Sequence, residues 1–380
     1  MFKFKPNYPF YDGVYRLLPT PERVNADPRF TGKGVTIAFL DSGFYPHPDL
    51  GDRVLSHIDA TSNRIIEGRR FHEPALYAWH GQMTSVIASG DGRMSNGLYR
   101  GIASSAHLLL IKVSTRRMRI KEPDILRGMS WLLTNYRRFN VRVINISLGG
   151  DFPSDNVEHP LHKIVRRLTD EGLIITIAAG NSGSAHLVPP ASAPEAITVG
   201  GYDDRNTLDE TKWRLYANNY GSSYDGTHKP EVIATAAWLP SPIMPNTEIE
   251  REARWLAPIL RAESEEEINR LIWEGHRDLG IMPNYARQPD DGVYAAIQER
   301  IDNYKIVDEH HQHVDGTSVS APIVASIIAQ MLEANPRLTP AQVRAILTAT
   351  SQPVEGISEK RQGTGRVDAA KAVAQAIESI

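Results

Sequence analysis

Apolar runs of strand length alternate with helical patterns along most of this chain. The runs are rich in β-branched residues, and glycine or proline bounds most of them. They lie at residues 35–40, 108–113, 141–146, 173–179 and 196–199. Between the second and third runs, apolar residues recur at helical spacing over residues 125–136. This alternation predicts an α/β fold in which helices cover both faces of a mostly parallel central sheet.

Composition excludes several classes of protein. The chain has 380 residues, no cysteine and a net charge of −3. Disulfides and thiolate metal sites are therefore excluded, and the charge argues against a nucleic-acid partner. The basic cluster at residues 116–121 is interpreted as a solvated turn. No stretch of 18 consecutive apolar residues occurs, so we expect no membrane span.

The N-terminal residues lack an apolar run of signal-peptide length, and prolines interrupt them early. A cytoplasmic protein is the simplest expectation, although a secreted mature form would look the same. We expect residues 1–30 to form an arm that leads into one domain at 31–380.

Residues 240–312 do not follow the alternation. They contain proline-rich joins and then acidic helical patterns. Asn246 or Thr247 could cap a first helix, Ser264 with Glu267 a second, and Asp290 or Asp291 a third. We predict a small helical insertion. Its acidic residues indicate a solvated face or a docking surface for a protein partner; they are Glu248, Glu250, Glu252, Glu263, Glu265, Glu266 and Glu267.

Three short motifs, far apart in the chain, contain groups capable of catalysis. Asp41-Ser42-Gly43 follows the first strand, His80-Gly81 opens a helical pattern, and Gly316-Thr317-Ser318 begins a long helix that is apolar on nearly every side. A hydroxyl is a poor nucleophile without a base, and imidazole titrates near neutral pH. Ser318 would thus be the nucleophile, His80 its base, and Asp41 the group that orients the imidazole.

Each motif also has an ordinary structural interpretation. Asp-Ser-Gly after a strand is often only a turn, a histidine at a helix start is often a cap, and Gly-Thr-Ser is often an N-cap. Their joint occurrence favours catalysis, because parallel strands and helix starts would bring all three to one edge of the sheet.

The order Asp, His, Ser and its flanks resemble the subtilisin-like serine peptidases (subtilases). Residues 316–322 resemble the nucleophile motif of that family, with one further residue before Pro322. By this resemblance, Asn181 in the segment 178–181 completes an oxyanion hole, and Gly180 beside it contacts substrate. Ser147, Leu148 and Gly149 would form one wall of the primary specificity pocket, and Ser182 and Val188 could border it.

The resemblance implies a serine endopeptidase that forms an acyl-enzyme on Ser318, takes peptide or protein substrates and requires no cofactor. Two alternatives stay open: a processing peptidase dedicated to one partner protein, and a pseudopeptidase that only binds. The chain departs from the family pattern at Gln82-Met83 after His80-Gly81, at Thr235-Ala236, and by the insertion itself.

Two possible metal sites have less support in the sequence than the catalytic motifs. His310, His311 and His313 could ligate a metal, but no carboxylate-rich motif accompanies them. Many subtilases bind structural calcium, and Asp49 with residues 91–96 could supply oxygens here. We expect no catalytic metal. We also hypothesise that residues 1–20 lie across the active site as an inhibitory arm.

Overall fold

The computed structural model describes residues 2–61, 65–68 and 74–379. Its centre is a nine-stranded sheet in the order β11-β7-β6-β5-β1-β4-β2-β3, with β8 beside β7. The strands are β1 (Thr36–Asp41), β2 (Val54–Asp59), β3 (Ile66–Glu67), β4 (His107–Lys112), β5 (Val141–Ile146), β6 (Ile174–Ala178), β7 (Ile197–Asp203), β8 (Arg214–Leu215) and β11 (Val232–Thr235). From β11 to β2 all neighbours are parallel, and β3 and β8 pair antiparallel.

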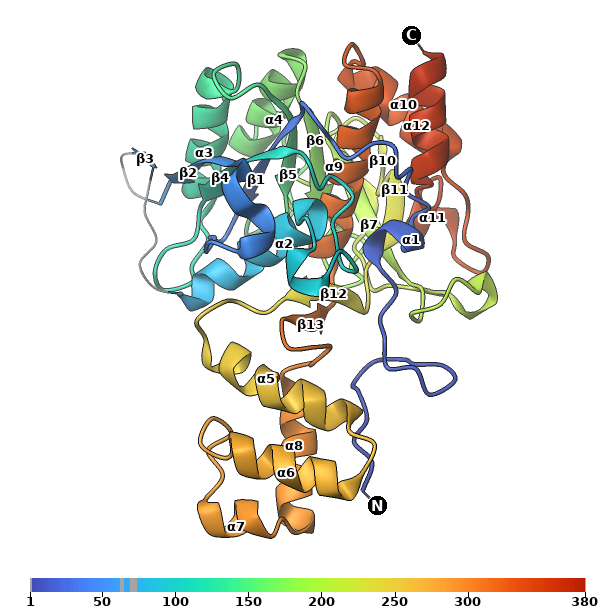
Figure 1. The fold of residues 1–380 in the computed structure, drawn as a ribbon. Helices are drawn as coiled ribbons and strands as arrows, with labels where there is room; N and C mark the ends of the chain where they lie inside the picture. The colour runs from blue at the N-terminus through green and yellow to red at the C-terminus, as the bar shows by residue number, and fades with distance from the viewer. Residues whose placement is uncertain (1, 62–64, 69–73, 380) are drawn as a thin grey trace.

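Helices cover both faces of this sheet, as predicted (Figure 1). Side chains alternate along β1: Ile37 and Phe39 enter one core, and Ala38 and Leu40 enter the other. The first core is shared with α2 (Trp79–Ser89), α9 (Thr317–Ala334), α10 (Pro340–Thr350) and α12 (Ala369–Glu378). The second is shared with α3 (Glu122–Asn135) and α4 (Pro160–Asp170).

Helix α9 is apolar on nearly every side because it lies inside the first core. By length and composition it is the only helix of the described ranges that could cross a membrane, and 83% of it is buried within the protein. That burial is typical of a core helix.

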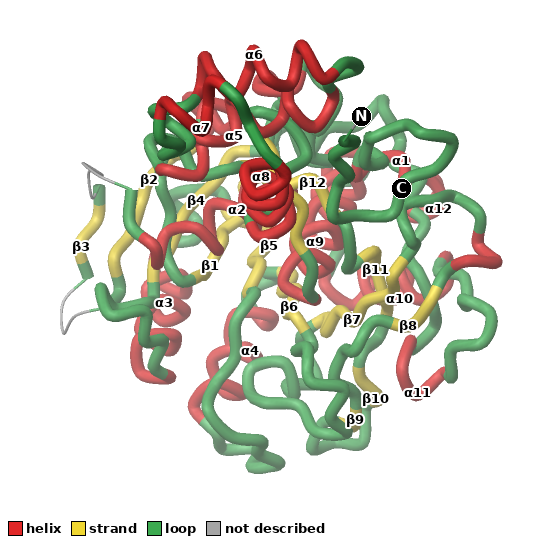
Figure 2. Tube along the Cα trace, turned by 90° about the horizontal axis from the view of Figure 1, so that it is seen from below, coloured by secondary structure: helices red, strands yellow, loops and turns green. Residues whose placement is uncertain are grey.

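The predicted insertion is a helical unit on a two-stranded stem. The stem pairs β12 (Leu239–Pro242) antiparallel with β13 (His311–Val314). Between them lie α5 (Glu248–Arg261), α6 (Glu265–Gly275), α7 (Pro283–Arg287) and α8 (Asp291–Asn303), which share a small core of their own. We call residues 239–314 the insertion. It lies below the sheet in Figure 1, and Figure 2 shows α8 end-on from that side.

The caps of the insertion helices follow the sequence. The side chains of Thr247, Ser264 and Asp290 accept hydrogen bonds from the backbones of Glu250, Glu267 and Val293. The acidic residues are exposed or half-buried, as expected of a solvated face, except for Glu252. Glu252 is 4% exposed and pairs with Arg300 of α8 (3.2 Å), because a buried carboxylate needs a cationic or hydrogen-bonding partner.

The N-terminal arm packs on the insertion. Phe4 is buried in the core of the insertion, and Lys5 exchanges two backbone hydrogen bonds with the Gln298 side chain (3.0 and 2.8 Å). Further along the arm, the amide of Leu18 donates to Asn206 (2.7 Å). No hydrogen bond of described arm residues reaches Asp41, His80 or Ser318. These contacts give no support to the hypothesis of an arm across the active site, which stays untested. Of the arm's aromatic side chains, Phe4 is buried against the insertion helices.

The remaining elements are short. They are α1 (Thr20–Arg23), β9 (Gly221–Ser222), β10 (His228–Lys229), α11 (Glu359–Gln362), and the 3₁₀ helices at Pro48–Arg53, Leu76–Ala78, Arg93–Ser95 and Glu210–Lys212. Sequence patterns did not identify these elements, nor β2, β3, β8, β12, β13 and α7, because short or proline-containing segments carry little periodicity.

Candidate functional site

Asp41 is the last residue of the central strand β1, and its carboxylate is 1% exposed. Oδ1 accepts from the Ser42 amide (2.6 Å) and lies 2.6 Å from Nδ1 of His80. Oδ2 lies 3.0 Å from the hydroxyl of Thr84. Hydrogen bonds to its oxygens from three directions hold the carboxylate in one orientation, as a group that must orient an imidazole requires.

His80 is the second residue of α2, and its side chain is 28% exposed. Burial lowers the pKa of His80, but the charge of Asp41 and the hydrogen bond to it raise that pKa above its ordinary value. Because Nδ1 faces Asp41, Nε2 is the nitrogen available to a substrate or nucleophile.

Gly81 allows this contact. A Cβ at Gly81 would lie 2.2 Å from the carbonyl oxygen of Gly43 and 3.0 Å from Cβ of Asp41. Any larger residue would push the start of α2 away from the end of β1. Close packing between α2 and the end of β1 thus explains why glycine follows His80.

Thr84 was not identified from the sequence. It lies one turn after His80 in α2, and its side chain is buried. Its hydroxyl oxygen lies 3.0 Å from Asp41 Oδ2 and 3.1 Å from the Gly81 carbonyl oxygen. The hydroxyl has a single proton to donate, and the charged carboxylate is the stronger acceptor of the two. The spacing of four residues in a helix was the available signal.

Ser318 is the second residue of α9, whose start depends on Gly316. Gly316 has φ +136°, which residues with a side chain rarely adopt. Ser147, just after β5, donates its hydroxyl to the carbonyl oxygen of Ser318 (2.9 Å). Asp41 ends β1 and Ser147 directly follows β5, and these two strands are parallel neighbours. His80 contacts Asp41 and Ser318 contacts Ser147, so His80 and Ser318 lie over adjacent strand ends.

Helices α2 and α9 also pack directly against each other. Among the hydrogen bonds of the described residues, none joins His80 to the Ser318 hydroxyl. Such catalytic bonds are often long without substrate and shorten in the complex, so the arrangement remains compatible with the predicted roles.

A buried series of side-chain hydrogen bonds ends at the backbone carbonyl oxygen of Ser318. The hydroxyl of Thr176 donates to Asn145 Oδ1 (3.2 Å), and Asn145 Nδ2 donates to Ser147 Oγ (3.0 Å). Ser147 then donates to the carbonyl oxygen of Ser318, so the three side chains form a continuous chain of hydrogen bonds to it. Asn145 and Thr176 were not identified from the sequence as part of the site. The side chain of Ser147 therefore supports the Ser318 backbone.

Asn181 lies beside the start of α9, with its side-chain orientation fixed. Its Oδ1 accepts from the amide and the hydroxyl of Thr317 (2.8 and 2.9 Å), and Thr317 Oγ1 accepts from the Gly180 amide (3.1 Å). A backbone amide can only donate, so the oxygen must face Thr317. Nδ2 therefore remains as a donor on the other side, next to the first turn of α9.

Two of the other predicted pocket residues, Gly149 and Val188, are in close contact. A Cβ at Gly149 would lie 2.7 Å from Val188 Cγ2, and Leu148 packs on the second core. Gly180 has φ +99°, and a Cβ there would lie 2.7 Å from Asn219 Nδ2. A specificity pocket bordered by Gly149, Leu148 and Val188 stays a prediction.

The metal hypotheses gain no support from side-chain geometry. His311 Nδ1 pairs with Asp308 Oδ1 (2.7 Å), and burial lowers the pKa of His313 to about 4. Asp49 Oδ1 accepts from the Met94 amide (3.0 Å), and Asp91 pairs with Arg93 (2.6 Å). Among the residues that the structure describes, no group of three or more His, Cys, Asp or Glu side chains gathers. Calcium binding through backbone oxygens stays a prediction.

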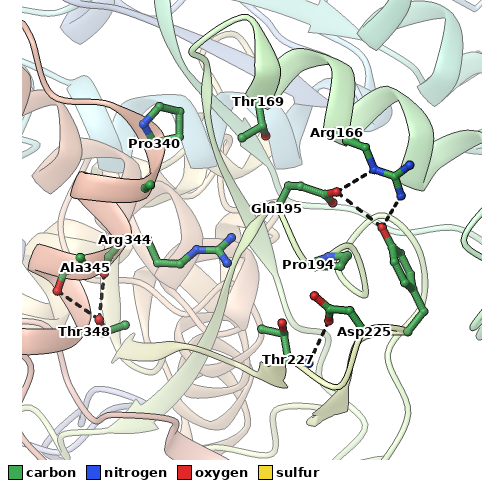
Figure 3. A pocket seen from close by; sticks show the side chains of 12 residues that line it. Arg166, Thr169, Pro194, Glu195, Asp225, Thr227, Pro340, Arg344, Ala345 and Thr348 are labelled. Atoms are coloured by element: carbon green, nitrogen blue, oxygen red, sulfur yellow. Dashed lines mark hydrogen bonds and ion pairs between the residues drawn. The ribbon is translucent and has the colours of Figure 1, made fainter.

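A cavity of about 700 Å³ opens elsewhere, between α4 and the start of α10 (Figure 3). Arg166 is held there by Glu195 (2.9 Å) and by the hydroxyl of Tyr224 (2.5 Å). Arg344, also in its wall, donates to the carbonyl oxygen of Ala196 (2.8 Å). None of the predicted catalytic residues lines this cavity, so the candidate site is the cluster at the carboxyl ends of β1, β5 and β6.

The sequence is similar to those of known serine proteases. The profile of the "Subtilase family" matches residues 32–365. Serine protease AprX of Bacillus subtilis (strain 168) is 27% identical over 352 residues, which cover 90% of this chain and 67% of AprX. Subtilisin BL of Lederbergia lenta is 31% identical over 196 residues, which cover 51% of this chain and 63% of that protein.

Solved structures show the same fold. The protease domain of PatA superposes with a TM-score of 0.62 at 18% identity, covering 93% of this chain and 99% of that domain. Fervidolysin from Fervidobacterium pennivorans, described as a keratinolytic enzyme related to subtilisin, gives 0.63 at 17% identity, covering 93% of this chain and 45% of fervidolysin. Because the family profile spans the strands and helices that hold Asp41, His80 and Ser318, the chain belongs to the subtilase family of serine peptidases.

Proposed function

We propose that the protein is a serine endopeptidase in which Ser318 is the nucleophile, His80 the general base and Asp41 the orienting carboxylate. The observation that supports this most is the 2.6 Å contact between His80 Nδ1 and Asp41 Oδ1, at the end of a buried central strand. A binding role alone would not require this pair.

The chemistry follows from these positions. Ser318 Oγ attacks the substrate carbonyl carbon while His80 Nε2 takes the hydroxyl proton. The negative charge that develops on the carbonyl oxygen is stabilised by Asn181 Nδ2 and the Ser318 amide. Collapse of this intermediate breaks the C–N bond, and His80 returns the proton to the leaving amine. Water, activated by His80, then hydrolyses the acyl-enzyme. No step requires a metal or another cofactor.

The test is covalent labelling by a fluorophosphonate probe, which reacts with activated serines. The protein should label, and Ser318→Ala should not. Ser320→Ala is the matched control, since Ser320 lies two residues further along α9 and its hydroxyl donates to backbone carbonyls of β11. Absence of labelling in the wild type would favour the pseudopeptidase.

A processing peptidase with one partner substrate is the second candidate. The insertion favours it, because it lies at the same edge of the sheet as the start of α9 (Figure 1) and would adjoin an incoming polypeptide. Casein hydrolysis comparable to that of a broad endopeptidase would exclude this narrower role. Labelling without casein hydrolysis would support it.

A further inference from the structure

The stem of the insertion contacts α2, the helix that contains His80. All eight residues of β12 and β13 are buried, and β12 packs against α2. From the end of β13 at Val314 the chain passes directly to Gly316 and the start of α9. The stem is thus continuous with the helix of Ser318 and packs on the helix of His80.

One side chain makes the contact specific. The amide oxygen of Gln312 in β13 accepts from the indole Nε1 of Trp79 (2.8 Å), and its amide nitrogen donates to the carbonyl oxygen of Tyr304 (3.3 Å). An indole N–H can only donate and a carbonyl can only accept, so this orientation of the Gln312 amide satisfies both partners. Tyr304 is the C-cap of α8. Gln312 therefore bridges the last helix of the insertion and the first residue of α2.

The start of α2 lacks one common restraint. Its N-cap residue, Ala78, provides no side-chain cap. The Asp41 carboxylate holds the imidazole of His80, but the position of the ring also depends on the backbone that carries it. Trp79 directly precedes His80, and their rings lie 6.1 Å apart in an edge-on arrangement. A restraint on the Trp79 indole is thus a restraint on His80.

We propose that Gln312 is a positioning residue for His80, acting through the Trp79 indole, so that the insertion is part of the active-site framework. This inference rests on the proposed function. A catalytic base must lie within hydrogen-bond reach of the proton that it takes, and small misplacements are costly. A second hydrogen bond also joins the insertion to the active-site region. Asn246 of the insertion donates to the hydroxyl of Tyr45 (3.1 Å), in the loop that follows Asp41.

The test is a double-mutant cycle in the full-length chain. Trp79→Phe removes the donor and keeps an aromatic ring, and Gln312→Met removes the acceptor at similar length. Each should lower kcat on a peptide substrate by roughly tenfold, because displacement of a catalytic group costs up to about 10²-fold. KM should change less than twofold, which is roughly 0.4 kcal/mol of substrate affinity. The double variant should be no slower than the slower single variant, since both changes break one contact.

One further readout and one control variant separate positioning from stability alone. The acidic limb of the kcat/KM profile should move to lower pH in both single variants, because a displaced His80 interacts less with Asp41. The matched control is Ser241→Ala, opposite Gln312 in the stem, whose buried hydroxyl has no hydrogen-bond partner among the described residues. It should leave kcat and the pH profile unchanged.

Variants that lower only the melting temperature, with kcat and the pH profile intact, would overturn the inference. Additive losses in the double variant, or an equal loss in Ser241→Ala, would overturn it as well. Wild-type protein that neither labels with a fluorophosphonate nor cleaves peptide would overturn the proposed function itself. An active wild type with fully active variants would overturn only the role of Gln312.

Discussion

The imidazole Nδ1 of His80 lies 2.6 Å from Oδ1 of Asp41, and the other carboxylate oxygen faces the hydroxyl of Thr84. The three groups come from two elements: β1 supplies the carboxylate, and α2 supplies both the imidazole and the hydroxyl. The carboxylate can therefore fix the imidazole tautomer with a proton on Nδ1, which leaves Nε2 as the base.

Asp41→Asn should lower kcat by about 10⁴-fold, since an amide no longer stabilises the required tautomer or the imidazolium that forms. Steady-state hydrolysis of a peptide substrate measures this. The matched control is Asp52→Asn, an exposed carboxylate that should leave kcat unchanged. A loss smaller than tenfold would contradict the orienting role of Asp41.

The activity should depend on pH through His80. Because the pKa of His80 is raised, and only the neutral ring can act as a base, kcat/KM should increase with pH through a midpoint above about 6.5. In Asp41→Asn, burial is no longer opposed by a negative charge, so the midpoint should fall. A profile that is flat between pH 5 and 8 (roughly the range in which histidine titrates) would exclude His80 as the base.

The same raised pKa links His80 to stability. A group whose pKa is higher in the folded state stabilises the fold fully below its unfolded pKa, and this contribution is lost as pH rises through the folded pKa. The melting-temperature difference between wild type and His80→Gln should therefore be largest at acid pH. A difference that grows as pH rises would contradict the assignment of the shift to Asp41.

Asn181→Ala should lower kcat by roughly 10²–10³-fold with little change in KM, as expected for a donor that acts on the transition state. Asn181→Asp keeps an acceptor for the Thr317 amide but removes the donor, so it should lose at least as much activity while α9 stays anchored. Retention of activity in the aspartate variant would show that the amide does not stabilise the oxyanion.

Deletion of residues 2–18 should destabilise the protein and should not activate it. Three large side chains of this arm, Phe4, Tyr8 and Leu17, are each at most 5% exposed. Burying a large apolar side chain contributes about 1.5–3 kcal/mol, so the melting temperature should fall by several degrees. Thermal denaturation and peptide hydrolysis measure the two effects. Higher activity at an unchanged melting temperature would instead support the hypothesis of an inhibitory arm.

Periodicity and turn chemistry were enough to predict much of the fold. The central strands at residues 35–40, 108–113 and 141–146 match β1, β4 and β5 to within one residue at each end, because buried parallel strands are continuous apolar runs. Strand β2 was missed because Ser56 and His57 interrupt its apolar pattern. The stem strands were missed because β12 contains two prolines, which usually argue against a strand.

The amino-acid sequence alone determined the fold class and the types of group available for catalysis, because hydrophobic periodicity and rare motifs are local properties of a chain. Only the tertiary structure decided which groups meet. Thr84 faces Asp41, Asn145 supports Ser147, and Gln312 reaches Trp79. A hydrogen bond depends on distances of about 3 Å between atoms, and for residues far apart in the sequence those distances are set by how strands and helices pack.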